Sequence, residues 1–143
     1  MQKNRVTDLE IKEDYPPNYL EIQSVLGNVG VYKPIFCYGK VIYNPFKREI
    51  TPDIEIHEQV HSKQQGDYPD VWYYKYLHDR DFRTKQEIEA YGAQYAFAKR
   101  FVKGEVLEWA LTNMAEALSG SIYDTGLSLG EAESKIRTLA KKK

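Results

Sequence analysis

The sequence contains little cysteine and little histidine, and it lacks both a long hydrophobic run and an excess of charge of either sign. Cys37 is the only cysteine among 143 residues, so the chain can form neither an internal disulfide nor a metal site built from cysteines. Twenty basic side chains balance 21 acidic ones and leave a net charge of −1. Because no basic excess is available to meet phosphates, we expect no nucleic-acid partner.

Membrane insertion and export are also disfavoured. No apolar run approaches the roughly 20 residues that a membrane-spanning helix needs. The stretch from Met1 to Asp14 is charged throughout and lacks the apolar segment of a signal peptide. We therefore expect a cytoplasmic protein that does not associate with a membrane.

The length fits one domain with a hydrophobic core and is too short for two. We place this single domain at residues 19–140. Residues 1–18 are polar, end in Pro16-Pro17 and are expected to form a flexible N-terminal arm. Residues 141–143 are three lysines and are expected to form a basic tail.

Three short segments predict a small sheet near the N-terminus. Apolar and other side chains alternate over residues 20–26, which suits a half-buried strand. Residues 30–36 contain Pro34, which fits an edge strand better than a central one. Residues 40–43 form a third strand, and the Asn44-Pro45 pair ends it.

The remainder of the chain predicts helices. Thr51 can cap a helix from about Pro52 to Gln65, which Gly66 can terminate. Thr84 can cap a long helix that reaches about residue 102. Further helices are expected over residues 68–77, 105–118 and 128–139. Strands first and helices after predict an α+β domain, with a small antiparallel or mixed N-terminal sheet followed by a helical part.

The aromatic segment 68–77 carries many of the 12 tyrosines of the chain. Aromatic side chains at helical spacing are more often part of a core than of a substrate groove, so we interpret this segment as a core helix. Cys37 lies in an apolar run and is expected to be a buried, inert thiol.

Two of the three histidines occur in one motif, His57-Glu58-Gln59-Val60-His61, inside the first long predicted helix. Residues four apart share a helix face, so both imidazoles can point at one ion, and Glu58 is close enough to reach a water beside it. This is the HExxH arrangement of two neutral imidazole ligands and a carboxylate base. With so few histidines in the chain, the pairing is hard to assign to chance.

A catalytic zinc needs a third protein ligand, and four residues downstream can supply it: Glu87, Glu89, Asp67 and His78. Glu87 and Glu89 are about 200° apart around a helix, so only one of them can face the metal. The face of Glu87 continues through small and polar residues, whereas the face of Glu89 continues through Gly92 and suits close helix packing.

The HExxH motif followed on a later helix by Glu87-Ile88-Glu89-Ala90-Tyr91 resembles the gluzincin metallopeptidases, in particular the minimal single-domain ones. The resemblance covers about residues 40–100, and the short layout also resembles small peptidase-like proteins carried by bacteriophages. It implies a zincin-like fold with the motif on the active-site helix. It further implies that His57, His61 and Glu87 hold Zn²⁺ while Glu58 acts as general base in peptide-bond hydrolysis.

The sequence departs from the family at Tyr91, which stands where the family has an aspartate that orients a ligand histidine. Asp79 and Asp81 are carboxylates that can take this role. The family also uses a tyrosine or histidine from a later segment to stabilise the oxyanion, and Tyr123 is the candidate here. In related enzymes the strand before the motif helix pairs with substrate, which implies such a role for residues 40–43.

The leading hypothesis is therefore a zinc metallopeptidase that acts on a peptide or protein substrate. The alternative is a catalytically silent protein that keeps the zincin fold and acts by binding or regulation. Both hypotheses allow for a protein partner or inhibitor.

Overall fold

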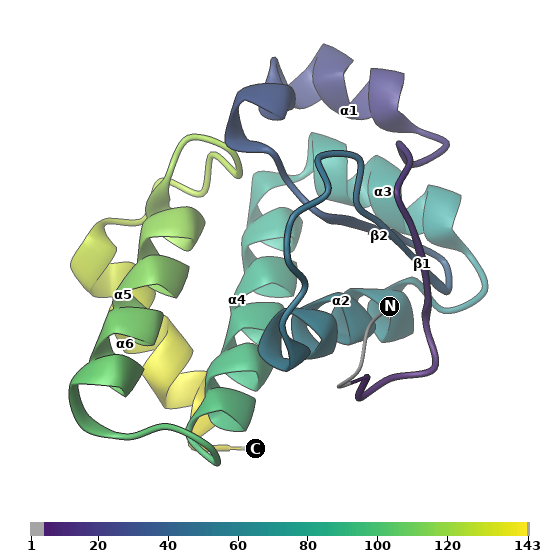
Figure 1. The fold of residues 1–143 in the computed structure, drawn as a ribbon. Helices are drawn as coiled ribbons and strands as arrows, with labels where there is room; N and C mark the ends of the chain where they lie inside the picture. Colours follow the sequence, from purple (N-terminus) through teal and green to yellow (C-terminus); the bar gives the residue numbers. More distant parts are fainter. Residues whose placement is uncertain (1–4, 143) are drawn as a thin grey trace.

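The computed structural model describes residues 5–142, and their architecture is α+β (Figure 1). The strands are β1 (Glu10–Lys12), β2 (Phe36–Tyr38) and β3 (Val41–Tyr43). The helices are α1 (Tyr19–Leu26), α2 (Pro52–Gln65), α3 (Pro69–His78), α4 (Arg80–Ala98), α5 (Gly104–Ser119) and α6 (Leu129–Ala140), with a 3-10 turn, η1 (Val29–Tyr32), between α1 and β2. The strands precede the long helices, as the sequence predicts.

The three strands form one mixed sheet with the order β1-β3-β2. β3 pairs parallel with β1 and antiparallel with β2. The predicted third strand is confirmed as β3. The predicted edge strand over residues 30–36 is confirmed only in its last residue, because β2 begins at Phe36, after the proline. Pro34 has no N–H to donate to a ladder, so pairing starts beyond it.

The strand predicted over residues 20–26 is wrong, because the chain forms helix α1 there. Ile22 is buried, whereas Leu20 is 80% exposed. Tyr19, Ile22 and Leu26 all pack in one core cluster, and their spacing of three and four residues is helical. In a segment of eight residues this spacing also produces an apparent alternation, which explains the error.

Part of the expected flexible arm is ordered structure. Glu10–Lys12 forms β1, and its pairing with β3 bridges about 30 residues of sequence. Nearer the start, the buried carboxylate of Glu55 in α2 accepts hydrogen bonds from Arg5 Nε at 2.9 Å and from the Thr7 backbone N–H at 3.0 Å. Residues 1–4 of the predicted arm and Lys143 of the predicted tail lie outside the described residues.

The helix that carries the histidine motif has the predicted bounds. Pro52 occupies the first turn of α2, and Gly66 ends the helix with a positive φ of 56°. Thr51 is the residue before the helix, but its hydroxyl donates to the Asp53 carboxylate at 2.6 Å instead of accepting from the backbone. The helix at the C-terminal end is also confirmed, and Ser128 caps α6 in a capping box with Glu131.

The long central helix starts earlier than predicted. Asp79 caps α4 by accepting from the Phe82 backbone N–H, and Thr84 lies inside the helix, where its hydroxyl donates to the Arg80 carbonyl. The predicted Thr84 cap is therefore wrong. α4 ends at Ala98, and Gly104 begins α5.

α4 runs through the centre of the molecule, with α5 and α6 on one side and α2, α3 and the sheet on the other (Figure 1). One hydrophobic cluster joins α4, α5 and α6, and a second joins α1, the sheet and α3. Gly92 of α4 allows α6 to approach closely, because a Cβ there would lie 3.0–3.1 Å from side-chain atoms of Leu139. The prediction of close helix packing on the face of Glu89 is confirmed.

Among residues 5–142 no helix combines the length and the apolar character that crossing a membrane requires.

Candidate metal centre

Helices α2 and α4 bring three buried side chains together between the two hydrophobic clusters. The Nε2 atoms of His57 and His61 lie 3.2 Å apart. Oε1 of Glu87 lies 3.3 Å from His57 Nε2, and its Oε2 lies 3.2 Å from His61 Nε2. A tetrahedral zinc with bonds of about 2.0–2.1 Å separates its ligand atoms by about 3.3 Å. The three side chains could hold a metal ion at this spacing.

One atom of this cluster lacks a partner. Oε1 of Glu87 is buried and has no hydrogen-bond partner among the described residues, although the His57 ring is nearby. A buried carboxylate oxygen without a hydrogen bond is costly, and a bound cation would satisfy it. Two imidazoles and a carboxylate are also the donor set of catalytic zinc sites. The residues therefore fit a divalent metal ion such as Zn²⁺.

The other candidates for the third ligand lie elsewhere. Glu89 is exposed and accepts a hydrogen bond from Gln64 Nε2 at 2.7 Å. Asp67 is exposed in the turn after α2, and the ring of His78 packs against Tyr74 on the far end of α3. Of the four candidates, only Glu87 joins the two histidines.

Amide side chains, rather than carboxylates, orient the two histidines. Nδ1 of His57 lies 3.0 Å from Oε1 of Gln94, and Nδ1 of His61 lies 2.8 Å from Oε1 of Gln64. Each amide oxygen accepts the Nδ1 proton, which leaves the Nε2 lone pair free for a metal. Asp79 caps α4 instead of contacting a histidine, so the expectation that it takes this role is wrong.

Both glutamines are in turn fixed. Gln94 Nε2 donates to Asp53 Oδ2 at 2.8 Å, and Gln64 Nε2 donates to the Gln86 carbonyl at 3.1 Å. Sequence reasoning missed these contacts, but a signal was available. Gln94 lies two helical turns after Glu87 on the same face, and Gln64 lies one turn after His61.

Tyr76 of α3 holds the side chain of Glu87 in place. Its buried hydroxyl donates to Oε2 of Glu87 at 2.5 Å. The rings of Trp72 and Tyr76 stack at 4.7 Å, and the aromatic segment of α3 is a core face, as predicted. The hydrogen bond from Tyr76 was not predicted, because it depends on how α3 crosses α4.

Burial and the neighbouring charges shift the pKa values of the site residues in opposite directions. Burial by itself lowers the pKa of His61, but the carboxylate of Glu87 raises it to about 9. Burial raises the pKa of Glu87, yet the two imidazoles outweigh it and hold that pKa well below its usual range. For Glu58, burial raises the pKa despite the neighbouring histidines. A cluster that holds a proton this firmly offers the same electron pairs to a cation, so metal binding would displace protons.

The remaining predicted site residues surround this cluster. Glu58 is buried, and its Oε2 lies 4.0 Å from His57 Nε2. The ring of Tyr91 packs edge-on against His57 with centroids 4.4 Å apart. The hydroxyl of Tyr91 lies 3.2 Å from the hydroxyl of Tyr123, which comes from the connection between α5 and α6. Burial raises the pKa of Tyr123 well above its usual range, so this phenol is protonated at neutral pH.

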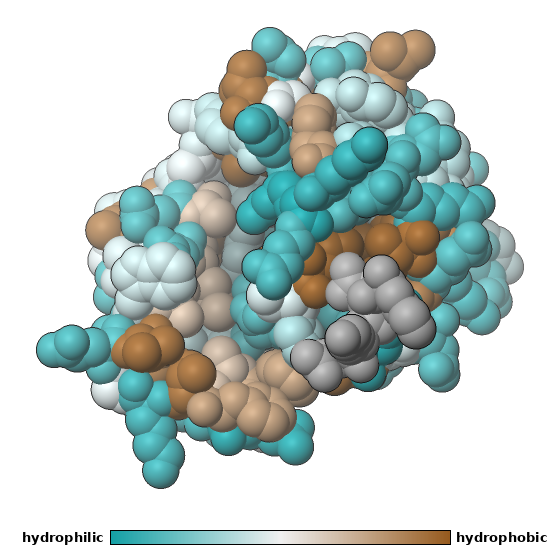
Figure 2. All heavy atoms as spheres, viewed as in Figure 1, coloured by the Kyte–Doolittle hydropathy of each residue, from teal (hydrophilic) through white to brown (hydrophobic). Residues whose placement is uncertain are grey.

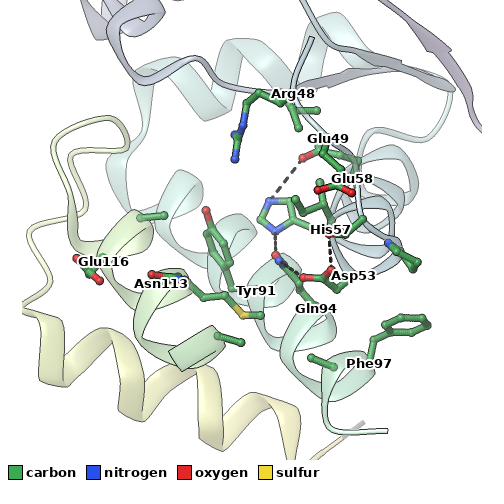
Figure 3. Close-up of a pocket in the computed structure, with 18 of the residues that line it drawn as sticks. Arg48, Glu49, Asp53, His57, Glu58, Tyr91, Gln94, Phe97, Asn113 and Glu116 are labelled. Carbon is green, nitrogen blue, oxygen red and sulfur yellow. Dashed lines mark hydrogen bonds and ion pairs between the residues drawn. The ribbon is translucent and has the colours of Figure 1, made fainter. Parts of the chain in front are cut away.

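A cleft of about 1410 Å³ opens onto His57 and Glu58 between α5 and the N-terminal half of α2. Figure 3 shows His57, Tyr91 and Gln94 on one wall and Asn113 and Glu116 of α5 on the other. Figure 2 shows hydrophobic surface at the lower end of the same face. Large exposed hydrophobic side chains line the cleft: Phe101, Val106 and Trp109.

A second, small cavity of about 60 Å³ reaches the cluster itself. His57, His61 and Glu87 line it together with Glu58 and Tyr123, and apolar residues of α1, β2 and α3 form much of the remaining wall. Cys37 borders it as a buried thiol, as predicted, and burial raises its pKa.

The strand expected to pair with substrate cannot do so. β3 is the central strand of the sheet, and β1 and β2 occupy both of its edges. The prediction for residues 40–43 is therefore wrong. Ile35, immediately before β2, lines both the cleft and the small cavity.

No protein-family model, no curated protein sequence and no solved structure matches this chain.

Proposed function

We propose that this chain is a zinc-dependent peptidase that hydrolyses peptide bonds with Glu58 as general base. The observation that carries the proposal is the cluster of His57, His61 and Glu87. The two Nε2 atoms lie 3.2 Å apart, and each lies 3.2–3.3 Å from one oxygen of the Glu87 carboxylate, which suits ligands of one metal ion. The cleft of about 1410 Å³ that opens onto His57 and Glu58 exceeds the usual size of a small-molecule pocket, which supports a polymeric substrate over a small molecule.

In this proposal His57, His61 and Glu87 hold Zn²⁺. The ion, when bound, acidifies water and polarises the carbonyl of the peptide bond. Glu58 accepts the proton of the attacking water and passes it to the leaving amine. Its neighbouring position on α2 and its burial keep it beside His57 and shielded from bulk solvent.

Tyr123 is the proposed donor to the developing oxyanion. Its protonated hydroxyl lies 3.2 Å from that of Tyr91, which packs on the ligand His57. A phenol held in this way can donate a hydrogen bond where negative charge develops. Through its contact with Tyr91, Tyr123 in the segment between α5 and α6 is linked to the metal cluster.

The substrate backbone is proposed to pair beside β2 instead of β3. The Cys37 carbonyl accepts from Gln65 Nε2 and Tyr73 OH, both at 2.8 Å, and so faces away from β3. Residues two apart in a strand direct their backbone groups to the same edge, so Ile35 offers its N–H and carbonyl to the cleft. Neither group has a hydrogen-bond partner among the described residues.

The arrangement also motivates a proposed zincin-like fold. A small sheet precedes the helix with the HExxH motif, and a later helix supplies the glutamate. These are the features on which the resemblance to gluzincins depends.

The test combines metal analysis with hydrolysis. The protein is stripped with a chelator, reconstituted with Zn²⁺ and assayed for bound zinc and for cleavage of fluorescein-labelled casein. We expect one zinc per chain in the wild type and in Glu58→Gln, with cleavage abolished in Glu58→Gln. Glu87→Ala should weaken zinc binding by about 100-fold or more, because a direct ligand is lost. Glu89→Gln and His78→Ala are matched controls that should bind zinc like the wild type.

Wild-type protein without stoichiometric zinc would show the proposal to be wrong. Stoichiometric zinc without any cleavage would instead identify a binding or regulatory protein on the same scaffold. Equal cleavage by the wild type and Glu58→Gln would show that Glu58 is not the general base.

A further inference from the structure

Arg48 is a charged residue of the cleft to which the proposed function gives no role. It lies in the loop between β3 and α2, is exposed, and lines the cleft. In Figure 3 its side chain extends into the cleft on the side of His57 and Tyr91.

Within residues 5–142, no carboxylate lies within ion-pair distance of Arg48. Its side chain makes one long contact, from Nη1 to the Lys33 carbonyl at 3.4 Å. The other arginine that lines the cleft, Arg5, is paired with Glu55 at 2.9 Å. Arg48 is therefore the arginine of this cleft whose charge is available to a ligand.

The backbone at Arg48 is fixed, so the guanidinium starts from a defined position. The buried side chain of Asn44 accepts from the Arg48 N–H at 3.0 Å and donates to the Arg48 carbonyl at 2.8 Å. Asn44 is itself tied to the sheet, because its N–H donates to the Lys12 carbonyl at 2.7 Å. These hydrogen bonds fix the Arg48 backbone beside the cleft, and none of them involves a residue of the metal cluster.

The charge of Arg48 also reaches the reacting side of the cleft. Arg48 lines the same cleft as Glu58 and Tyr91. A substrate bond placed beside Glu58 would lie within range of the same charge.

We propose that Arg48 binds a carboxylate of the substrate and so selects peptides with an acidic group close to the bond that is cleaved. A guanidinium presents paired N–H donors that match both oxygens of a carboxylate, and its charge is permanent. The inference rests on the proposed function. The carboxylate has two possible sources, an aspartate or glutamate side chain and the C-terminal carboxylate of the substrate.

Binding to a silenced protein tests this recognition apart from catalysis. The background is zinc-loaded Glu58→Gln, and the probes are fluorescein-labelled degenerate peptide pools measured by fluorescence anisotropy. One pair of pools is blocked at both ends and has glutamate or glutamine at a fixed position. The second pair lacks acidic side chains and ends in a free carboxylate or an amide.

We expect one acidic pool to bind about 10-fold more tightly than its neutral counterpart, as suits a charged hydrogen bond. Adding Arg48→Gln should reduce that ratio to about 1, and Arg48→Lys should retain part of it. Arg137→Gln, which removes an exposed arginine of α6, is the matched control and should leave the ratio unchanged. The pair of pools that shows the preference identifies the source of the carboxylate.

Equal binding of acidic and neutral pools, or no binding of either, would overturn the inference, as would a preference that survives Arg48→Gln. So would a loss of kcat in Arg48→Gln that is equal for acidic and neutral substrates at unchanged affinity, because that result assigns the arginine to the transition state. An acidic preference in a protein that cleaves nothing would support the inference and contradict the peptidase. Cleavage by the wild type without such a preference would support the peptidase and contradict the inference.

Discussion

Nδ1 of His57 lies 3.0 Å from the amide oxygen of Gln94, two helical turns beyond Glu87 on α4. The same helix therefore supplies a ligand of the candidate metal centre and the group that orients another ligand. Because Gln94 also donates to Asp53 near the start of α2, it joins the two helices that form the centre.

The contact between Gln94 and His57 makes a prediction about metal affinity. Gln94→Leu removes the acceptor for the Nδ1 proton, so the imidazole is free to rotate and its tautomer is no longer fixed. We expect zinc affinity to fall by about 10- to 100-fold, measured by competition with a chromophoric chelator. Gln94→Glu combined with Asp53→Asn keeps both an acceptor for the imidazole and a hydrogen bond between the two helices, and it should retain most of the affinity. If Gln94→Leu binds zinc like the wild type, the amide does not position the histidine.

Tyr76 and Tyr74 form a matched pair for a prediction about stability. The Tyr76 hydroxyl is buried and donates to Glu87, whereas Tyr74 on the same helix is 67% exposed. Tyr76→Phe leaves a buried carboxylate short of a donor, so we expect the free energy of unfolding of the metal-free protein to fall by about 1–3 kcal/mol. Tyr74→Phe should change it by less than about 0.5 kcal/mol. Urea denaturation followed by circular dichroism measures both, and equal values would contradict the role given to Tyr76.

The sequence predicts those parts of the fold that depend on neighbouring residues. Pro52 and Gly66 mark the ends of α2, and the spacing of His57 and His61 places both imidazoles on one face. The strand β1 could not be found in this way. It has three residues, and it exists because it pairs with β3, a segment about 30 residues away.

The same distinction separates the predicted and the missed parts of the site. His57 and His61 belong to one motif, and Glu87 follows from a second motif on a predicted helix. Tyr76 carries no local signal for its hydrogen bond to Glu87, because the contact depends on the crossing of α3 and α4. The central place of β3, which leaves it no free edge, likewise depends on the order of strands in the sheet.

Substitution by alanine is expected to have opposite effects on protein stability at Gly92 and at Gly130. A Cβ at Gly92 would lie 3.0–3.1 Å from Leu139, so Gly92→Ala forces α4 and α6 apart and should destabilise the protein by about 1–3 kcal/mol. Gly130 lies in α6 with no atom near the position of a Cβ. Gly130→Ala should stabilise the protein by up to about 1 kcal/mol through helix propensity. Thermal unfolding of both variants decides the matter, and a stabilising Gly92→Ala would show that the helices are not in close contact.

Substitution of Trp109 tests how the wide cleft contributes to substrate binding. Its side chain is 69% exposed and lines the cleft, so an extended peptide can bury it on binding without any change in the free protein. Trp109→Ala should therefore raise KM for labelled casein by about 10-fold, with kcat and Tm close to those of the wild type. Tyr74→Ala, which removes an aromatic ring of similar exposure outside the cleft, should leave KM unchanged. A fall in kcat at constant KM would instead place Trp109 in the reacting geometry, and equal KM values in the two variants would mean that substrate does not occupy this end of the cleft.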